Sequence, residues 1–400
     1  MTLQIALKYI VKSLLLTPIL LIFYVNGCLY YSPTHNTEGY SKDVLRQLKY
    51  LKYQLHEKHA ATKMQGLFPE GFVFTTTLYG LAWADFAENL NKKSPLFQEA
   101  INEVKWSIEQ VESEEGKANF DPILPLKYGA YYTGWVTYLM GKYLVLNPND
   151  SIITPVFNEN CQYINNAILN TKSPYLESYT GLAWPADNIM CLASLSLYNK
   201  IYPPQYKAII STWLSRIKQH LDTEIGLIPH AFNPETNQGA EGVRGSSQSL
   251  INCFLMEIDS SFAKEQFALF KKHFIEKRLG LSAVLEYPIG VDKQGDVDSG
   301  PVIWGVGTAA SIVAIRTMAV NDDPLYVPIR NSIEALGFAN SFGKGKKYIF
   351  GALPMADAFL AWSNAAEKQV APTPPFLWRA VFHLISLIII VPFCWWIYRL

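Results

Sequence analysis

Side chains that could transfer protons gather in three loops of this chain, each at the start of an apolar segment. Asp187 begins one such segment, His230 lies in a long Gly-rich loop, and Glu286 and Asp296 share a third loop. Two carboxylates held close together can have their pKa values driven apart, which produces one acid and one base. We therefore predict Asp187, Glu286, Asp296 and His230 as the catalytic residues of an acid–base reaction.

The loops also hold side chains suited to binding a substrate. Clustered tyrosines supply proton donors and stacking faces, and Arg244 beside a helix start suits an anion or a carboxylate. The predicted substrate-binding residues are Glu70, Tyr128, Tyr131, Tyr132, Trp184, Asn188, Cys191, Glu241, Arg244, Gln248, Tyr287 and Asp298.

Structural explanations compete with these functional ones. Glu70 would also fit a solvated turn, and Asp187 would also fit the favourable end of a helix dipole. Asp298 is a good helix cap. Arg244 would also fit an ion pair with an acidic residue of a neighbouring loop.

Several classes of site are absent from the sequence. It contains no GxSxG, HExxH or dinucleotide-binding pattern, and GKGKK at 343–347 lacks the context of a phosphate-binding loop. DVDSG at 296–300 resembles part of a calcium loop but lacks the remaining ligand spacing. We therefore predict no metal and no cofactor. The formal net charge is zero and no basic stripe is present, which excludes a nucleic-acid partner.

Twelve helices are predicted to position these loops. Six apolar, small-residue-rich segments repeat at intervals of 52 to 60 residues, and six amphipathic stretches alternate with them. The apolar helices are predicted to start near Thr76, Tyr131, Ala186, Ser246, Ile303 and Met355. The amphipathic helices are predicted at 43–63, 95–112, 153–170, 204–222, 260–278 and 324–338. The pattern indicates an all-α protein, an (α/α)6 toroid of six helical hairpins over residues 40–366, with the polar loops at one end of the ring.

The two ends of the chain are predicted to be membrane segments. Residues 1–31 hold an apolar run after Lys8 and Lys12, which is typical of a signal anchor or a transmembrane segment. A Pro-rich linker at 367–375 precedes an apolar stretch at 376–400 that is long enough to cross a bilayer. The lysines favour a cytoplasmic N-terminus. We therefore expect a lipid bilayer as a partner, with the toroid on the extracytoplasmic side of the cell membrane.

The loop sequences resemble those of a known family. The strings FPEG, YGAYYTGW, GLAWPADN, RGSSQS, EYPIGV and GDVDSGPVIWGVG are similar to those of bacterial membrane-associated proteins with a linalool dehydratase/isomerase-like domain. The resemblance spans about residues 40–365 and implies an (α/α)6 toroid. It also implies acid–base groups, including cysteine, tyrosine, histidine and aspartate, around a terpene alcohol.

Three functions follow from these observations. The first is a membrane-anchored hydrolase or lyase acting on a glycan, because carboxylates and aromatic side chains crowd the loops. The second is a hydro-lyase or isomerase acting on a small apolar alcohol, as the resemblance implies. The third is a non-catalytic binding or scaffold protein, in which the loop carboxylates would be paired structurally.

Overall fold

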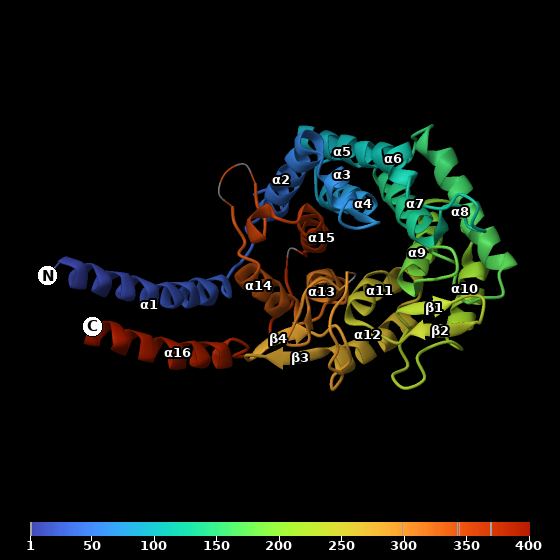
Figure 1. Cartoon of the computed structure of the whole chain (residues 1–400). Coiled ribbons are helices and arrows are strands. Elements are labelled where there is room, and N and C mark those ends of the chain that lie inside the picture. The colour runs from blue at the N-terminus through green and yellow to red at the C-terminus, as the bar shows by residue number, and fades with distance from the viewer. Residues whose placement is uncertain (1, 298, 342, 344, 369) are drawn as a thin grey trace.

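Six helices form a closed inner ring in the computed structural model, which describes residues 2–297, 299–341, 343, 345–368 and 370–400 (Figure 1). Each helix contacts the next around the ring, and the last contacts the first. These inner helices are α4 (Gly71–Ala87), α7 (Gly129–Leu146), α9 (Pro185–Ile201), α11 (Gly245–Ile258), α13 (Thr308–Val320) and α15 (Pro354–Ala365).

An outer layer of amphipathic helices packs around this ring. In α5 (Pro95–Val111), for example, Phe97, Ile101, Val104 and Ile108 are buried at the spacing of one helix face. The other outer helices are α2 (Lys42–Lys58), α8 (Ile153–Asn170), α10 (Lys207–Ile217), α12 (Ser260–Phe274) and α14 (Tyr326–Leu336). Two short helices, α3 (Ala60–Gln65) and α6 (Glu114–Lys117), lie in the connections. The predicted all-α (α/α)6 toroid is confirmed.

Small residues allow the inner helices to approach closely. A Cβ added at Gly134 would lie 3.0 Å from the Cβ of Met190, and one at Gly141 would lie 2.7 Å from Leu197 Cδ2. Because α7 packs its glycines against α9, neither helix has a solvent-exposed stripe. In α4 every residue except Phe74 is buried.

Three short antiparallel β-hairpins interrupt the helical pattern. They are β1 (Ala231–Asn233) with β2 (Gln238–Glu241), β3 (Ile275–Arg278) with β4 (Leu281–Val284), and β5 (Val302–Ile303) with β6 (Val306–Gly307). The prediction of helix over 260–278 is therefore wrong beyond Phe274. The predicted helix start at Ile303 is also wrong, because Trp304 and Gly305 adopt positive φ of 52° and 79° and turn the chain into a hairpin before α13.

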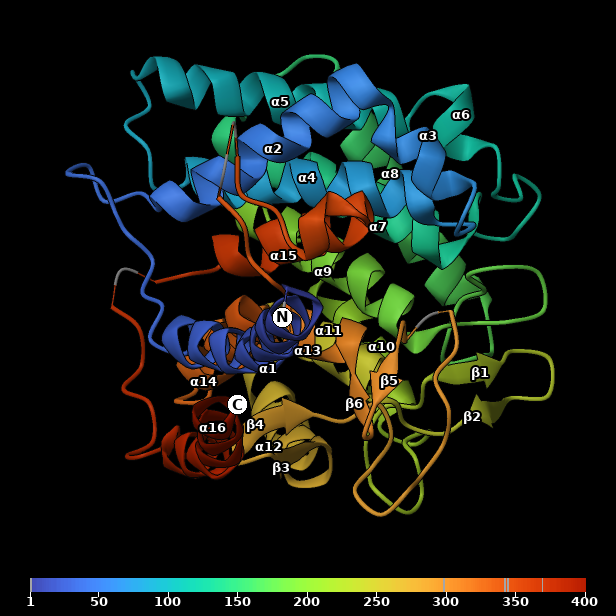
Figure 2. The same ribbon diagram turned by 60° about the vertical axis from the view of Figure 1, so that its left-hand side comes forward.

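The terminal helices α1 (Thr2–Cys28) and α16 (Ala380–Arg399) lie side by side outside the ring, with the two chain ends next to each other (Figures 1 and 2). Within the part of the chain that is described, both are long and apolar enough to cross a membrane by length and composition. Asn26 donates from Nδ2 to Ser386 Oγ at 2.9 Å, so a polar contact joins the two helices near the ring.

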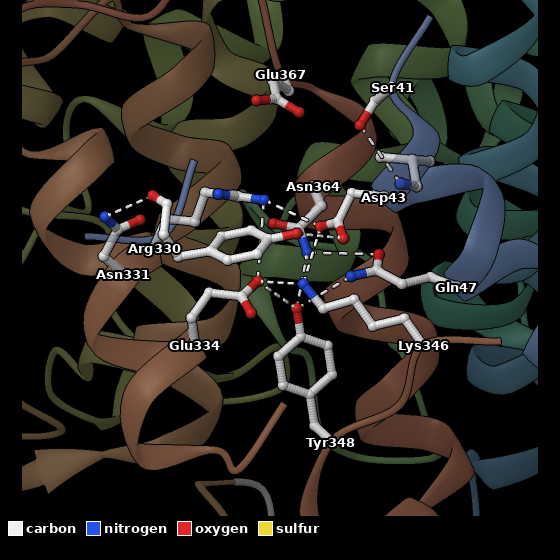
Figure 3. A network of polar contacts seen from close by, with 12 residues as sticks. Ser41, Asp43, Gln47, Arg330, Asn331, Glu334, Lys346, Tyr348, Asn364 and Glu367 are labelled. Atoms are coloured by element: carbon white, nitrogen blue, oxygen red, sulfur yellow. Dashed lines mark hydrogen bonds and ion pairs between the residues drawn. The ribbon is translucent and has the colours of Figure 1, made fainter. Parts of the chain in front are cut away.

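The ring closes between its first and last hairpins through a buried polar network (Figure 3). The Lys346 ammonium donates to Asp43 Oδ2 of α2 at 2.9 Å and to Glu334 Oε1 of α14 at 2.6 Å. Arg330 donates to the same Asp43 oxygen at 3.1 Å. The Tyr31 hydroxyl donates to the other Asp43 oxygen at 2.6 Å.

The side chains of Asp43, Arg330, Glu334 and Lys346 are all at most 3% exposed. Burial raises the pKa of Asp43, but the charges of Lys346 and Arg330 outweigh it and hold that pKa below its usual value. The carboxylate therefore stays ionised inside the protein. Two cations and two carboxylates thus neutralise one another where α2, α14 and the loop before α15 meet.

Candidate active site

A cavity of about 300 Å³ lies at the end of the ring where the inner helices begin. Residues of all six loop regions or inner helices contribute to its wall. The lining residues include Phe68, Glu70, Phe74, Tyr131, Tyr179, Trp184, Asp187, His230, Ser246, Ser247, Leu250, Val297, Pro301, Thr308, Ile312, Val313, Leu353, Met355 and Phe359. The cavity therefore lies at the end of the ring where the sequence predicts that the six loops open.

The cavity has two chemically different sides. The first four hairpins supply most of the polar groups, namely Glu70, Tyr131, Tyr179, Asp187, His230, Ser246 and Ser247. They also supply the apolar residues Phe68, Phe74, Trp184, Ala186 and Leu250. The last two inner helices and their loops supply mainly apolar groups, which are Val297, Pro301, Ala309, Ile312, Val313, Leu353, Met355, Ala356 and Phe359, together with Thr308. A ligand would therefore present a polar group to α4, α7, α9 and α11, and an apolar surface to α13 and α15.

Two tyrosines surround Glu70 on the polar side. The Tyr179 hydroxyl donates to Glu70 Oε1 at 2.5 Å, and the Tyr131 hydroxyl donates to the Glu70 backbone carbonyl at 3.3 Å. Burial raises the pKa of Tyr131 far above its ordinary value, and the charges of Glu70 and Asp187 raise it further. Tyr131 is therefore protonated at neutral pH and can donate a hydrogen bond. The charges of both carboxylates disfavour its ionisation.

Asp187 reaches the cavity from the first turn of α9. Its backbone N–H donates to the carbonyl of the N-cap residue Trp184 at 3.0 Å, within the first turn of the helix that begins at Pro185. The residue is 7% exposed. Trp184 lies edge-on to Tyr179, with the ring centroids 5.6 Å apart. Asp187, Trp184 and Tyr179 thus bring a carboxylate and two aromatic rings to the same wall.

His230 is buried and neutral. Its Nε2 lies 3.3 Å from an Arg244 nitrogen, and its Nδ1 lies 2.6 Å from Ser247 Oγ. A guanidinium only donates, so Nε2 accepts, and Nδ1 carries the proton and donates to Ser247. Burial and the Arg244 charge lower the pKa of His230 to about 3. His230 therefore does not activate Ser247 as a nucleophile, and it leaves the Ser247 hydroxyl hydrogen free to meet a ligand.

Arg244 organises a second group of predicted site residues behind the cavity wall. Its Nε donates to Glu286 Oε1 at 2.8 Å, and its two terminal nitrogens donate to Asp296 at 2.6 and 2.7 Å. Arg244 is the main cause that lowers the pKa of Asp296. Burial raises the pKa of Glu286, with Ser246 and Arg244 opposing it. Neither Glu286 nor Asp296 lines the cavity.

Glu241 and Tyr287 belong to the same group. A Glu241 oxygen lies 3.7 Å from Arg244, and the Arg244 guanidinium lies over the Tyr287 ring at 5.6 Å. Since these residues surround Arg244 and do not line the cavity, the arrangement matches the alternative in which Arg244 pairs with acidic residues of neighbouring loops.

Other predicted residues support the walls from outside the cavity. Asn188 exchanges hydrogen bonds with the Leu176 backbone at 2.7 and 3.0 Å. The Cys191 thiol faces α7, 3.5 Å from the Ala130 carbonyl, and burial raises its pKa. Tyr128 is the residue directly before α7 and makes no side-chain capping bond to it. The Tyr132 hydroxyl donates to Val111 O, and Gln248 donates to Ile228 O. Asp298 lies outside the described residues.

Sequence reasoning missed several residues of the wall. Tyr179 could have been found, because it lies in the same loop as the predicted residue Trp184. Ser246 and Ser247 stand at the predicted start of a helix, where capping was the simpler explanation. Met355 and Phe359 gave no signal, because an inner helix that is apolar all round does not reveal which face meets a cavity.

Within the described residues, no group of three or more His, Cys, Asp or Glu side chains is arranged to hold a metal ion. The polar side of the cavity instead offers two carboxylates, two phenols, an imidazole and two hydroxyls. Such groups can hold a ligand hydroxyl and transfer protons to and from it.

Comparison with known proteins gives structural similarities only. No protein-family model matches the chain, and no curated protein matches it. One similar structure is a novel alpha-amylase from Clostridium perfringens, with a TM-score of 0.44 and 14% identity over 74% of this chain and 87% of that one. Another is a family 105 glycoside hydrolase from C. acetobutylicum ATCC 824, with a TM-score of 0.44 and 12% identity over 72% of this chain and 92% of that one.

Proposed function

We propose that the protein is a membrane-anchored acid–base enzyme that dehydrates or isomerises a small, mainly apolar alcohol. The two-sided cavity carries this proposal. Its apolar wall from α13 and α15 suits a hydrocarbon body, and its polar wall suits one hydroxyl group. A free sugar would leave most of its hydroxyls without partners on the apolar side, which is costly.

The proposed reaction needs one acid and one base. The acid protonates the substrate hydroxyl as the C–O bond breaks and water leaves. The base takes a proton from the neighbouring carbon, and that C–H electron pair forms the double bond. We assign these roles to Asp187 and Glu70, the two carboxylates that line the cavity. Tyr131 and Tyr179 would hold the hydroxyl, and His230 would orient Ser247.

The anchoring part of the proposal rests on α1 and α16. Both helices have the length and composition of membrane spans, and they project side by side. Lys8 and Lys12 favour the cytoplasm for the N-terminus, which leaves the toroid outside. In intact cells, an Ile152→Cys variant in which Cys28 and Cys394 are replaced by Ser should then react with a membrane-impermeant maleimide. In the same background, a Thr2→Cys variant should react only after permeabilisation, and the reverse pattern would contradict this orientation.

A glycan hydrolase or lyase is the second candidate. It is favoured by the pair of carboxylates and by Tyr179 and Trp184, which bring two aromatic rings to the cavity. Stacking on aromatic rings and two carboxylates about 5–10 Å apart are what a glycosidase requires. Here Asp187 and Glu70 would flank a glycosidic oxygen.

One assay separates these candidates. The full chain in lipid nanodiscs would be incubated with terpene alcohols and, separately, with oligosaccharides, and the products would be identified by mass spectrometry. We expect an alkene or a rearranged alcohol, and we expect Asp187→Asn or Glu70→Gln to reduce its formation by about 100-fold or more. Asp322→Asn, at an exposed position, is the control. Release of reducing or unsaturated sugars would favour the glycan candidate. Absence of both products, with binding retained, would favour a binding or scaffold protein.

A further inference from the structure

Large apolar side chains surround the place where the terminal helices leave the ring. Leu279, Ile303, Trp304, Phe338, Phe350 and Leu377 are between 36% and 69% exposed, and we call them the collar. Large exposed apolar side chains that gather in one region of a protein mark a surface that binds a membrane, a ligand or another protein.

Contacts fix the collar to the ends of α1 and α16. A Cβ at Gly280, next to Leu279, would lie 2.5 Å from Val381 in the first turn of α16. The β3–β4 hairpin that carries this turn reaches the base of α16 (Figure 1). Arg278 donates from Nε to the Trp304 carbonyl at 2.9 Å, so the tip of the β5–β6 hairpin lies beside Leu279.

The opposite side of the collar contacts α1. Phe338 stacks on Tyr24 of α1 with ring centroids 6.1 Å apart, and Phe350 stacks on Phe338 at 6.3 Å. The Tyr24 hydroxyl also donates to the Ala339 carbonyl at 3.3 Å. Leu377 lies three residues before α16. Both sides of the helix pair are therefore flanked by exposed apolar tips.

The backbone of the collar is held in an unfavourable conformation. Five of its six residues, all except Ile303, have φ between 47° and 59°. Bulky side chains rarely adopt this left-handed region, and such residues persist only where the surrounding structure holds them in place. Here the conformation places each apolar side chain at the outer tip of a turn.

We propose that the collar enters the lipid headgroup boundary and seats the toroid on the bilayer surface. This inference rests on the proposed anchoring by α1 and α16, because the collar is continuous with those helices. A bilayer fits better than a protein partner, because the collar surrounds two spans whose own surfaces are almost entirely unburied. The exposed Lys277, two residues before Leu279, would meet lipid phosphates.

Depth-dependent quenching tests the collar in the full chain. Cys28 and Cys394 would be replaced by Ser, and an environment-sensitive fluorophore would be attached to a Trp304→Cys or a Phe350→Cys variant in nanodiscs. The three remaining cysteines are buried. Lipids would carry a nitroxide quencher either near the headgroup or deep in the acyl chain. The control is Ile152→Cys, an exposed position directly before α8. Helix α8 lies on the side of the ring away from α1 and α16 (Figure 1). In a separate variant that keeps Cys394 and replaces only Cys28, the label on Cys394 reports on α16.

We expect the labels at 304 and 350 to lose fluorescence with the shallow quencher and much less with the deep one, because interfacial side chains reach about 5–10 Å into the boundary. The label at 152 should be unaffected, and the label at Cys394 should respond to quenching lipids. If the Cys394 label is quenched while the labels at 304 and 350 are not, the collar does not enter the bilayer, although α16 does, and the proposed anchoring is kept. If no label is quenched, both proposals fail. Labels at 304 and 350 that become shielded without quencher-lipid dependence would show that a protein covers the collar, which also overturns the inference.

Discussion

Lys346→Met tests whether the buried network at the closure of the ring holds the toroid together. Methionine preserves most of the side-chain volume but removes the charge that lies 2.9 Å from Asp43 and 2.6 Å from Glu334. Removing one partner of a buried ion pair costs about 3–5 kcal/mol, because the remaining charge is left uncompensated. Arg330 stays 3.1 Å from Asp43, so we expect the lower end, about 3 kcal/mol.

The assay is thermal unfolding of the full chain in nanodiscs, followed by the helical circular dichroism signal. At about 2 °C per kcal/mol, the lower value for large domains, Tm should fall by about 6 °C. Lys368→Met is the matched control, since its pair with Asp322 is 47% and 67% exposed. Exposed pairs contribute about 1 kcal/mol or less.

The pH dependence gives the same prediction a second test. The lowered pKa of Asp43 contributes stability above its unfolded pKa of about 4, and this contribution is lost as pH falls through the folded pKa. Lys346→Met removes the largest cause of that lowering. The deficit of the variant should therefore be greatest at neutral pH and shrink towards pH 4, by at most about 1.4 kcal/mol per pH unit. Equal losses in both lysine variants, or a deficit independent of pH, would refute this reasoning.

Three further predictions concern other buried positions. Gly245→Ala should destabilise the protein by about 3 kcal/mol, because its Cβ would lie 1.9 Å from the Leu285 carbonyl oxygen. The control Gly242→Ala, whose Cβ would lie 3.6 Å from its nearest neighbour, should leave stability unchanged. Equal denaturation midpoints for the two variants would disprove the clash. Burial raises the pKa of Asp357 from 3.8 to about 7, so stability should fall as pH rises through that range. Asp357→Asn should flatten that slope by up to about 1.4 kcal/mol per pH unit, and parallel wild-type and variant curves would count against it. Burial and Arg244 lower the pKa of His230 to about 3, so stability should fall as pH drops below about 6.5; His230→Asn should weaken this dependence, measured as the change in Tm between pH 7 and pH 5.

The helical architecture was predictable because each helix type carries its own pattern. Outer helices such as α5 show a buried stripe, whereas inner helices such as α4 are apolar all round. The three β-hairpins were not predictable from periodicity. Their strands have two to four residues each, which is too short for an alternating pattern to register.

The candidate site was predictable in position but only partly in detail. Asp187 and His230 line the cavity, whereas Glu286 and Asp296 pair with Arg244 behind it. Residue type alone does not distinguish these cases, since the same carboxylate serves as a ligand group or as a countercharge depending on its neighbours. Cys191 lies one turn after Asp187 on the same face of α9. At that point the face packs against α7, so Cys191 contacts the Ala130 carbonyl and does not line the cavity.

The contact between Asp43 and Lys346 joins residues 303 positions apart. At about 5–20 residues per second, a ribosome needs roughly 15–60 s to make the intervening chain. Five hairpins are complete before either cationic partner of Asp43 has been made, because Arg330 is synthesised only shortly before Lys346. On the proposed topology, this open arc waits on the far side of the membrane, attached by α1 alone, until the last hairpin arrives. Chains truncated before Arg330 lack both cationic partners of Asp43, so their ring should remain open.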